Sequence, residues 1–410
     1  MSMDAPFLSE NIKVVTPGLA VGKKKVSRAF QPTFTVTRDS TVFCFCQGRL
    51  GEGWDDDVKA ILMNKSEDGG RSWGQFRTIS APMNHFALSA YTFEESGQEK
   101  LAVVVCVDLN LTRDFYRDTE ASVGLRPDFD LFALPEWQPC VLLRLLSGDG
   151  GKTWDYEMID GDRSPLGREC SGHVPAFINM IGQIQKVESG PHAGRIFTSG
   201  PVYAKPVGEP MTANFRDHHA VGSAVLYSDD CGASWKMDGI AADYLANESS
   251  AVLIEGGKKL LMVRRLNHEK MMEKYPVKNE YRPGYGHRIF QTSEDWGKTW
   301  SDYRAVPLSG VPCHGTLCRI GERLYFSIPQ GVGDDVEADW THGRERGTIY
   351  FSDDDGETWT PRVVEPGRFS YSTVGPLSET EQICFFAEGN LGDFGVACRI
   401  FNDAWLEQEE

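Results

Sequence analysis

Five aspartates recur along this 410-residue chain in the same local pattern, so their carboxyl groups are its most regularly spaced reactive groups. An aspartate can act as a general acid, a general base or a nucleophile. One reaction centre cannot use five carboxylates that each lie in a separate copy of the same turn. We therefore interpret all five as scaffold residues: Asp68, Asp149, Asp230, Asp295 and Asp354.

The pattern around each aspartate is Ser-x-Asp-x-Gly-x-(Ser/Thr)-Trp, called the box below. An apolar run before each box predicts a strand, and the Asp-x-Gly segment predicts a tight hairpin turn. Asp can accept bonds from amides across the turn, Gly supplies a positive φ, and we expect Trp to pack the turn against its own sheet. The boxes begin at Ser66, Ser147, Ser228, Ser293 and Ser352.

The boxes start 81, 81, 65 and 59 residues apart, which indicates one repeated supersecondary unit. Such a unit cannot bury its own apolar face and must stack on its neighbours. Four-stranded units of about 40 to 70 residues predict an all-β fold, a six-bladed β-propeller with one degenerate blade. We expect residues 1–410 to form a single domain in which the N-terminal segment before Arg49 completes the last blade.

The composition narrows the classes of partner. The formal net charge of −17 argues against nucleic acid and against an anionic membrane surface, so an anionic ligand would need local arginines. No run reaches the roughly 18 apolar residues of a membrane span, and no secretory signal pattern opens the chain, which predicts a cytoplasmic protein. Ten cysteines without paired spacing predict reduced core thiols, and neither a metal nor a cofactor is expected.

Two segments interrupt the repeat, Asp108 to Pro139 and Asn267 to Tyr285. Each is open to two interpretations. It is either a surface excursion between strands or a loop over the mouth of the ring that sets specificity.

The repeated box with this spacing resembles the Asp-box, or BNR repeat, of sialidases, which are six-bladed propeller glycosidases. The similarity extends outside the boxes over nearly the whole chain. Because other propellers carry such boxes without being enzymes, the central site must decide the function. The resemblance to exo-sialidases implies three arginines that hold a sugar carboxylate, a tyrosine nucleophile polarised by a glutamate, and an aspartate acid/base on a flexible loop.

Residues of the later blades match this set in family order. Arg344 stands eight residues before the serine of the last box, as the third arginine of the family does, and Tyr371 matches the nucleophile. Glu248 matches the glutamate that activates the tyrosine. Arg264 and Arg265 are alternatives for the second arginine, because side chains of a strand alternate between its faces and only one can point at the site. We favour Arg264.

The first blade supplies the matched acid/base. Arg49 closes a Gln-Gly-Arg segment, and Asp55 follows it by six residues, at the offset that the family uses for this aspartate. Asp56 and Asp57 are immediate rivals for the role. The alternative interpretation of this acidic run is a solvated loop.

The same blade also departs from the family. Phe30 stands where sialidases have the arginine of an Arg-Ile-Pro motif, and Arg28 lies two residues earlier. Either a local insertion lets Arg28 reach the carboxylate, or that arginine is missing. Where the family has an aspartate lining the pocket, this chain has Asn84 and His85.

The chemistry explains the implied tyrosine. Departure of a leaving group from a ketosidic carbon that bears a carboxylate builds positive charge beside a fixed negative charge. An anionic nucleophile would be repelled there, whereas a neutral phenol would not. The resemblance therefore implies a retaining exo-glycosidase that removes sialic acid from a sialic-acid-type glycoside. The alternatives are a hydrolase for another 2-keto-3-deoxy sugar acid, such as the deaminated sialic acid Kdn, and a noncatalytic carbohydrate-binding propeller.

Overall fold

The computed structural model describes most of the chain. It covers residues 5–408 except 52–54, 118–129, 216–218, 243–245, 267–287, 303, 307, 309, 312, 332–342 and 390–393, and only the backbone of 219–220, 246–247, 266 and 305–306. The predicted excursion at Asn267 to Tyr285 therefore lies outside the described residues. No helix among those described is long and apolar enough to cross a membrane.

Six four-stranded antiparallel sheets form the blades, as the box spacing predicts. Blade I holds β4 (Arg28–Val36), β5 (Val42–Arg49), β6 (Lys59–Ser66) and β7 (Arg77–Thr78). Blade II holds β8 (Asn84–Glu95), β9 (Gln98–Asp108), β10 (Cys140–Ser147) and β11 (Asp155–Ile159). Blade III holds β12 (His173–Ile178), β13 (Ile181–Lys186), β14 (Ile196–Pro206) and β15 (His219–Ser228).

The remaining blades follow in chain order. Blade IV holds β16 (Ala246–Ile254), β17 (Lys259–Leu266), β18 (Arg288–Ser293) and β19 (Arg304–Val306). Blade V holds β20 (Leu317–Ile320), β21 (Arg323–Pro329), β22 (Glu345–Ser352) and β23 (Thr360–Arg368). Blade VI holds β24 (Ser370–Pro376), β25 (Gln382–Glu388) and β26 (Gly395–Phe401), with β1 (Ile12–Val15) as its outer strand.

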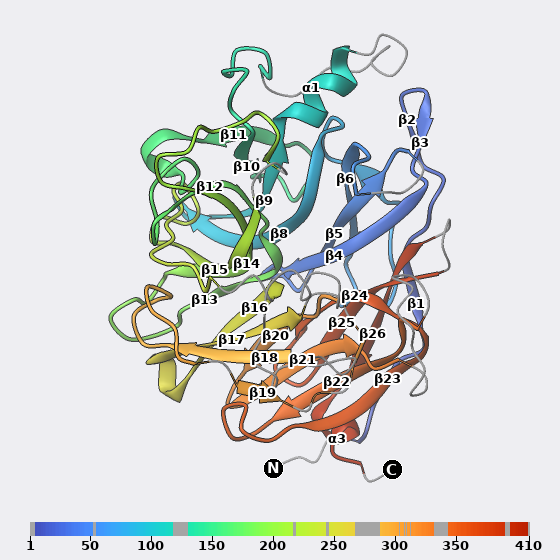
Figure 1. The fold of residues 1–410 in the computed structure, drawn as a ribbon. Coiled ribbons are helices and arrows are strands. Elements are labelled where there is room, and N and C mark those ends of the chain that lie inside the picture. The colour runs from blue at the N-terminus through green and yellow to red at the C-terminus, as the bar shows by residue number, and fades with distance from the viewer. Residues whose placement is uncertain are drawn as a thin grey trace.

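The ring closes through its inner strands. Strands β4, β8, β13, β16, β20 and β24 each contact the next around the circle, and β24 contacts β4 again. Figure 1 shows these strands converging on the middle of the molecule. Blade VI carries no box: the short helix α3 (Asp403–Leu406) follows its third strand instead. The interrupting segment Asp108 to Pro139 begins with the helix α1 (Leu109–Arg117).

The five boxes form the same hydrogen-bonded turn. In the box of blade I, Ser66 donates to the carboxylate of Asp68 at 2.7 Å and accepts the Gly70 amide at 2.8 Å. Hydrogen bonds from Ser72 and Ser66 lower the pKa of Asp68 to about 2. The other four boxes repeat both serine contacts. The five aspartates therefore hold turns, as predicted.

The tryptophans correct one expectation. Trp73 of blade I packs edge-on against Phe385 of blade VI, and Trp154 of blade II packs against Phe45 of blade I. Our prediction that each Trp packs its turn onto its own sheet is therefore wrong for these boxes. A methyl group added at Gly70 would also meet Ile383 of blade VI, so the box is a contact between blades.

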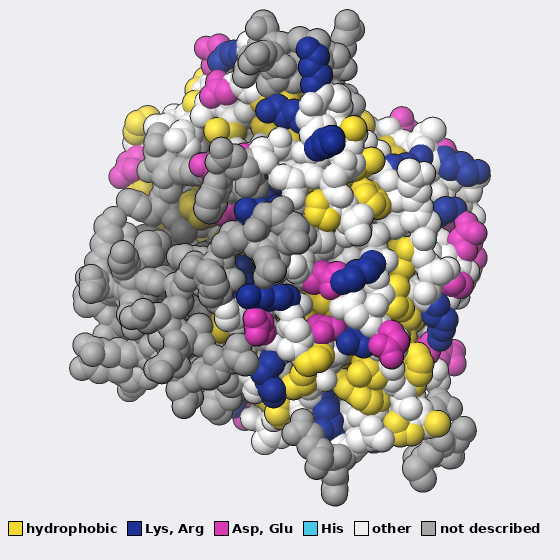
Figure 2. All heavy atoms as spheres, turned by 90° about the vertical axis from the view of Figure 1, so that its right-hand side faces the viewer, with side chains coloured by type: hydrophobic (Ala, Val, Ile, Leu, Met, Phe, Trp, Pro, Cys, Tyr) yellow, Lys and Arg dark blue, Asp and Glu magenta, His cyan; other side chains and the backbone are white. Residues whose placement is uncertain are grey.

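Charge is mixed on the one face of the molecule that Figure 2 draws. The face drawn in Figure 2 carries basic and acidic side chains interspersed, with no single-sign patch among the residues drawn in colour. The ten cysteines all lie in the described part of the chain and form no disulfide, and nine of them are buried. The core of each pair of blades is built from alternating apolar residues of facing sheets.

We predict that Ser352→Ala lowers the free energy of unfolding by about 1–3 kcal/mol, because the buried Gly356 amide loses its acceptor at 2.9 Å. Urea unfolding followed by circular dichroism measures the change. The control is Ser378→Ala. Ser378 is an exposed serine in a turn, and the backbone amides of Thr380 and Glu381 that donate to its hydroxyl can bond to water instead. Equal stability of the wild type and Ser352→Ala would contradict the role given to the box serine.

Candidate active site

The centre of the ring holds a tyrosine bonded to a glutamate. Ser370 pairs with Ala387 and Ser372 with Phe386, so Tyr371 is an extra residue in a bulge of β24. A bulge bends a strand and re-aims the side chain of the extra residue. The Tyr371 hydroxyl donates to Glu248 Oε1 at 2.6 Å, across the ring from blade VI to blade IV.

Glu248 is positioned by the same device. The register of β16 and β17 shifts between Ala246 and Ser249, so two residues of β16 face a single residue of β17, Arg265. Arg265 Nη1 donates to Glu248 Oε2 at 2.5 Å and lies 3.4 Å from the Tyr371 hydroxyl oxygen. Glu248 and Arg265 are both buried, which makes this a desolvated ion pair.

A second cation lies over the tyrosine ring. The guanidinium of Arg344, just before β22, is 5.2 Å from the centroid of the Tyr371 ring. Arg344 Nη1 also donates to Ser370 Oγ at 3.2 Å. Two arginines from different blades therefore flank Tyr371.

The charges set the proton positions of the pair. Burial and the negative charge of Glu248 raise the pKa of Tyr371, against the opposing effect of Arg265 and Arg344. Burial would raise the pKa of Glu248, but the charge of Arg265 and the bond from Tyr371 outweigh it and lower that pKa. Glu248 is therefore ionised and Tyr371 neutral near pH 7, with the phenol as hydrogen-bond donor.

Arg264 does not reach this site, so our preference for it over Arg265 is wrong. Its guanidinium donates to Gln291 at 2.7 Å and to the Ala241 carbonyl at 3.0 Å, between blades III and IV. Arg264 and Arg265 are adjacent in β17 and point to opposite faces. The bulge that pairs Ser249 with Arg264 leaves Arg265 on the face of Glu248.

Arg49 and Asp55 of blade I join the site through an aromatic ring. Arg49 Nη2 lies 2.8 Å from Asp55 Oδ1, with the arginine side chain 7% exposed and the aspartate 68% exposed. The Arg49 guanidinium is 5.0 Å from the Phe30 centroid, and the Phe30 and Tyr371 rings are 4.8 Å apart. Asp55 is thus the solvent-facing end of a contact series that begins at Tyr371.

The rival aspartates lie differently. Asp57 folds back on its own loop, where a methyl group at Gly51 would fall 2.1 Å from Asp57 Oδ1. Asp56 is exposed. The Asp55 carboxylate pairs with Arg49 at 2.8 Å, so Asp55 stays our candidate for the acid/base.

Arg28 lies beside Arg49. The two are cross-strand partners in β4 and β5, and Arg28 is half-buried. Burial and the nearby charge of Arg49 lower the pKa of Arg28. A bulge follows at Gln31, so an irregularity does interrupt this strand, and the β4 side chain that packs against the Tyr371 ring is Phe30.

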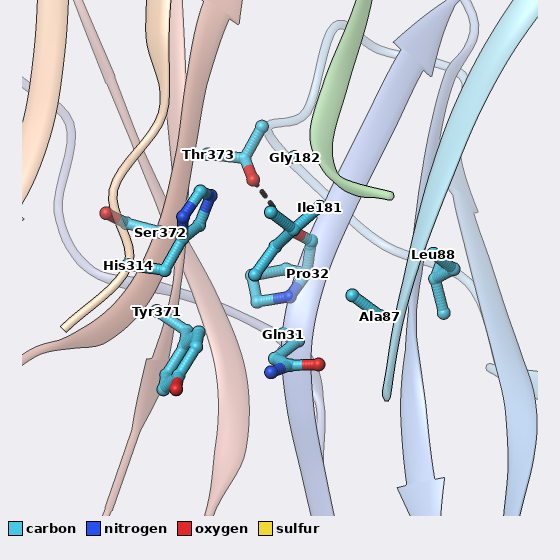
Figure 3. A pocket seen from close by; sticks show the side chains of 10 residues that line it. All are labelled: Gln31, Pro32, Ala87, Leu88, Ile181, Gly182, His314, Tyr371, Ser372 and Thr373. Carbon is cyan, nitrogen blue, oxygen red and sulfur yellow. Dashed lines mark hydrogen bonds between the residues drawn. The ribbon is translucent and has the colours of Figure 1, made fainter. Parts of the chain in front are cut away.

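A small cavity lies beside Tyr371 among the inner strands β4, β8, β13 and β24. Figure 3 shows Tyr371 and His314 on one side of this cavity, Gln31 of β4 next to Tyr371, and Ala87 and Leu88 of β8 on the other side. His314 also lines a second cavity beside Glu248 and Arg265. Burial lowers the pKa of His314 to about 4, so its ring is neutral near pH 7.

The sequence reasoning missed a supporting arginine. Arg288 is fully buried and donates to the carbonyls of Val311 and Cys313 at 3.1 and 2.9 Å. Cys313 Sγ in turn accepts the Tyr371 amide at 3.1 Å. The signal available in the sequence was a charged residue at the start of an apolar strand. In the folded sheet Arg288 pairs directly with Arg265.

Asn84 and His85 do not line the cavity drawn in Figure 3. The Asn84 side-chain amide donates to the carbonyls of Asp56 and Asp57 at 3.0 and 2.9 Å. His85 is fully buried, and burial together with the charges of Lys59 and Arg49 lowers its pKa well below the usual range.

Known proteins give a consistent comparison, although no family model matches the chain. It is 27% identical over 386 residues to a sialidase from Micromonospora viridifaciens, a match that covers 92% of this chain and 51% of that protein. The chain thus spans about half the length of that relative.

Solved structures share the fold. Trypanosoma rangeli sialidase aligns with a TM-score of 0.62 at 14% identity, over 98% of this chain and 60% of that one. An intramolecular trans-sialidase from Ruminococcus gnavus aligns with a TM-score of 0.59 at 13% identity, over 96% and 99%. At these identities the structural likeness concerns the fold alone. The six-bladed ring and the sequence relatives agree, and the predicted resemblance of this chain to the sialidase superfamily is confirmed.

Proposed function

We propose that this protein is a retaining exo-glycosidase that hydrolyses terminal, α-ketosidically linked sialic acid or a related 2-keto-3-deoxy sugar acid. The observation that carries the proposal is the 2.6 Å hydrogen bond from the Tyr371 hydroxyl to Glu248, flanked by Arg265 and Arg344. A phenol bonded to an ionised carboxylate has a base ready to take its proton as it attacks.

The arginines suit an anionic sugar. Arg265 and Arg344 place positive charge around Tyr371 in a chain whose net charge is −17, so a carboxylate is attracted locally. Arginine binds carboxylates in a planar, bidentate manner that also fixes their orientation. Arg28 and Arg49, which are cross-strand partners at the edge of the site, are the candidates for the third arginine contact.

The proposed reaction is a double displacement at the anomeric carbon. Tyr371 oxygen bonds to the anomeric carbon while its proton passes to Glu248, and the glycosidic bond breaks with its electron pair moving to the leaving oxygen. Asp55 gives that oxygen a proton. Asp55 then takes a proton from water, whose oxygen attacks the anomeric carbon. The bond between that carbon and the Tyr371 oxygen breaks with its electron pair moving to the tyrosine oxygen, and Glu248 returns the proton to Tyr371. Two displacements retain the anomeric configuration.

A second candidate is a hydrolase specific for a different sugar acid, such as Kdn. It is favoured by Phe30 beside Tyr371 and by the neutral Asn84, since both change positions that recognise substrate in the resembled family. A noncatalytic propeller is disfavoured, because such a protein has no need to bring Arg265, Arg344 and Tyr371 together.

We predict that Tyr371→Phe lowers kcat for an aryl sialoside by about a thousandfold or more, because the nucleophilic oxygen is lost. Tyr325→Phe is the matched control. The Tyr325 hydroxyl also donates to a carboxylate, Asp403, at 2.6 Å, but on the outer part of the molecule, and turnover should persist. Unchanged turnover in Tyr371→Phe would refute the proposal.

The sugar acid is decided by kcat/KM on paired aryl glycosides of N-acetylated sialic acid and Kdn. The leading proposal predicts a preference for the N-acetylated sugar, and the second candidate predicts the reverse.

Proton NMR of the first-formed product should show the retained anomer. Release of the inverted anomer would contradict the tyrosine mechanism.

Acid should destabilise the site through His314, whose pKa falls from about 6.5 in the unfolded chain to about 4 in the folded protein. Between pH 4 and 6.5 the unfolded state therefore binds more protons than the folded state. The contribution of neutral His314 to the free energy of unfolding is complete above pH 6.5 and is lost as the pH falls to 4. The loss amounts to about 3 kcal/mol. Unfolding midpoints measured from pH 4 to 7 should depend less on pH in His314→Gln than in the wild type. The same substitution at the half-buried His173 is the control, and an unchanged slope in His314→Gln would rule out this role.

A further inference from the structure

Three consecutive carbonyls of the Asp55 loop accept hydrogen bonds from two side chains. Lys59 Nζ donates to the carbonyls of Asp55 and Asp57 at 2.6 and 2.8 Å. The Asn84 amide nitrogen donates to those of Asp56 and Asp57 at 3.0 and 2.9 Å. The backbone from 55 to 57 is therefore fixed from two directions.

Both donors are fully buried, unlike the loop that they hold. Lys59 and Asn84 are each 0% exposed, whereas the side chain of Asp55 is 68% exposed. Burying an ammonium group is costly unless its hydrogen bonds are satisfied, and here backbone carbonyls satisfy them. The Phe86 ring adds a cation–π contact at 5.1 Å.

The two donors come from rigid strands. Lys59 opens β6 and is the cross-strand partner of Arg49, so it shares a strand pair with the arginine that contacts Asp55. Asn84 is the first residue of β8 in the next blade, and its backbone N–H donates to Thr112 Oγ1 at 2.9 Å. The loop is thus tied to two blades at once.

We propose that Lys59 and Asn84 are positioning residues that hold the Asp55 carboxylate for proton transfer to the leaving oxygen. The inference rests on the proposed role of Asp55 as the acid/base. It also accounts for Asn84 in place of the family's aspartate, because a carboxylate at this position would face the loop carbonyls with like charge. Neither residue touches the reacting atoms; both act through the loop.

A general acid matters most when the leaving group is a poor one. An alkyl glycoside needs a proton on its departing oxygen, whereas a 4-nitrophenyl glycoside releases a stable anion without one. Displacement of Asp55 should therefore slow the alkyl substrate much more than the aryl one. A general loss of stability would slow both alike.

The experiment measures kcat/KM of the full-length wild type, Asn84→Asp, Lys59→Met and Asp55→Asn on methyl and 4-nitrophenyl glycosides of the preferred sugar acid. We expect Asn84→Asp and Lys59→Met to lose at least about tenfold more on the methyl than on the 4-nitrophenyl glycoside, in the pattern of Asp55→Asn. Asn64→Asp is the matched control. Asn64 is also a buried asparagine whose amide donates to two carbonyls, those of Val14 and Gly74, but away from Asp55.

Amide exchange of Leu50, whose amide donates to the Val58 carbonyl at the end of the loop at 3.1 Å, is followed by mass spectrometry and supplies a readout that needs no substrate. It should accelerate at least about tenfold in Asn84→Asp and not in Asn64→Asp. Exchange that is equal in wild type and Asn84→Asp would overturn the inference, as would equal losses on both glycosides. A wild type inert on both glycosides would refute the proposed function instead, and exchange would still decide whether the loop is held.

Discussion

The hydrogen bond between Tyr371 and Glu248 is the constraint on which the centre of this molecule depends. It joins blades IV and VI across the ring, at 2.6 Å, in a region where burial disfavours an unpaired charge. Glu248 is kept ionised by Arg265, and Arg265 in turn lies next to Arg288, which holds the segment under Tyr371 through two carbonyls. Removing either Glu248 or Arg265 leaves the other as a buried charge that has lost its ion-pair partner.

Bulges are the means by which regular strands supply this irregular centre. Tyr371, Glu248 and Gln31 each lie at a register shift in an inner strand. A strict alternation would send half of the side chains of an inner strand into the contacts between blades. The extra residue in each bulge turns a side chain toward the axis without disturbing the sheet beyond it.

The sequence predicted the ring because the boxes are local: a serine, an aspartate and a glycine within five residues make the same contacts in every copy. It predicted the neighbourhood of Arg344, Glu248 and Tyr371 from a family resemblance. It missed the choice of Arg265 over Arg264, because that choice is made by a bulge two residues long in another strand. It also missed the contacts of Asn84 and of Trp73, since their partners lie in other segments of the chain and no local spacing encodes them.

Blade VI, which carries Tyr371, is completed by β1, whose residues pair with β26 across almost the entire length of the chain. A ribosome makes β1 before the strands of blades I to V and β26 after them, so β1 must wait through the synthesis of five blades before its partner exists. Domains fold as units once their elements are available. The blade that carries the tyrosine is therefore complete only after β26 has been made, and a translation product that stops after the fifth box carries every box but lacks Tyr371.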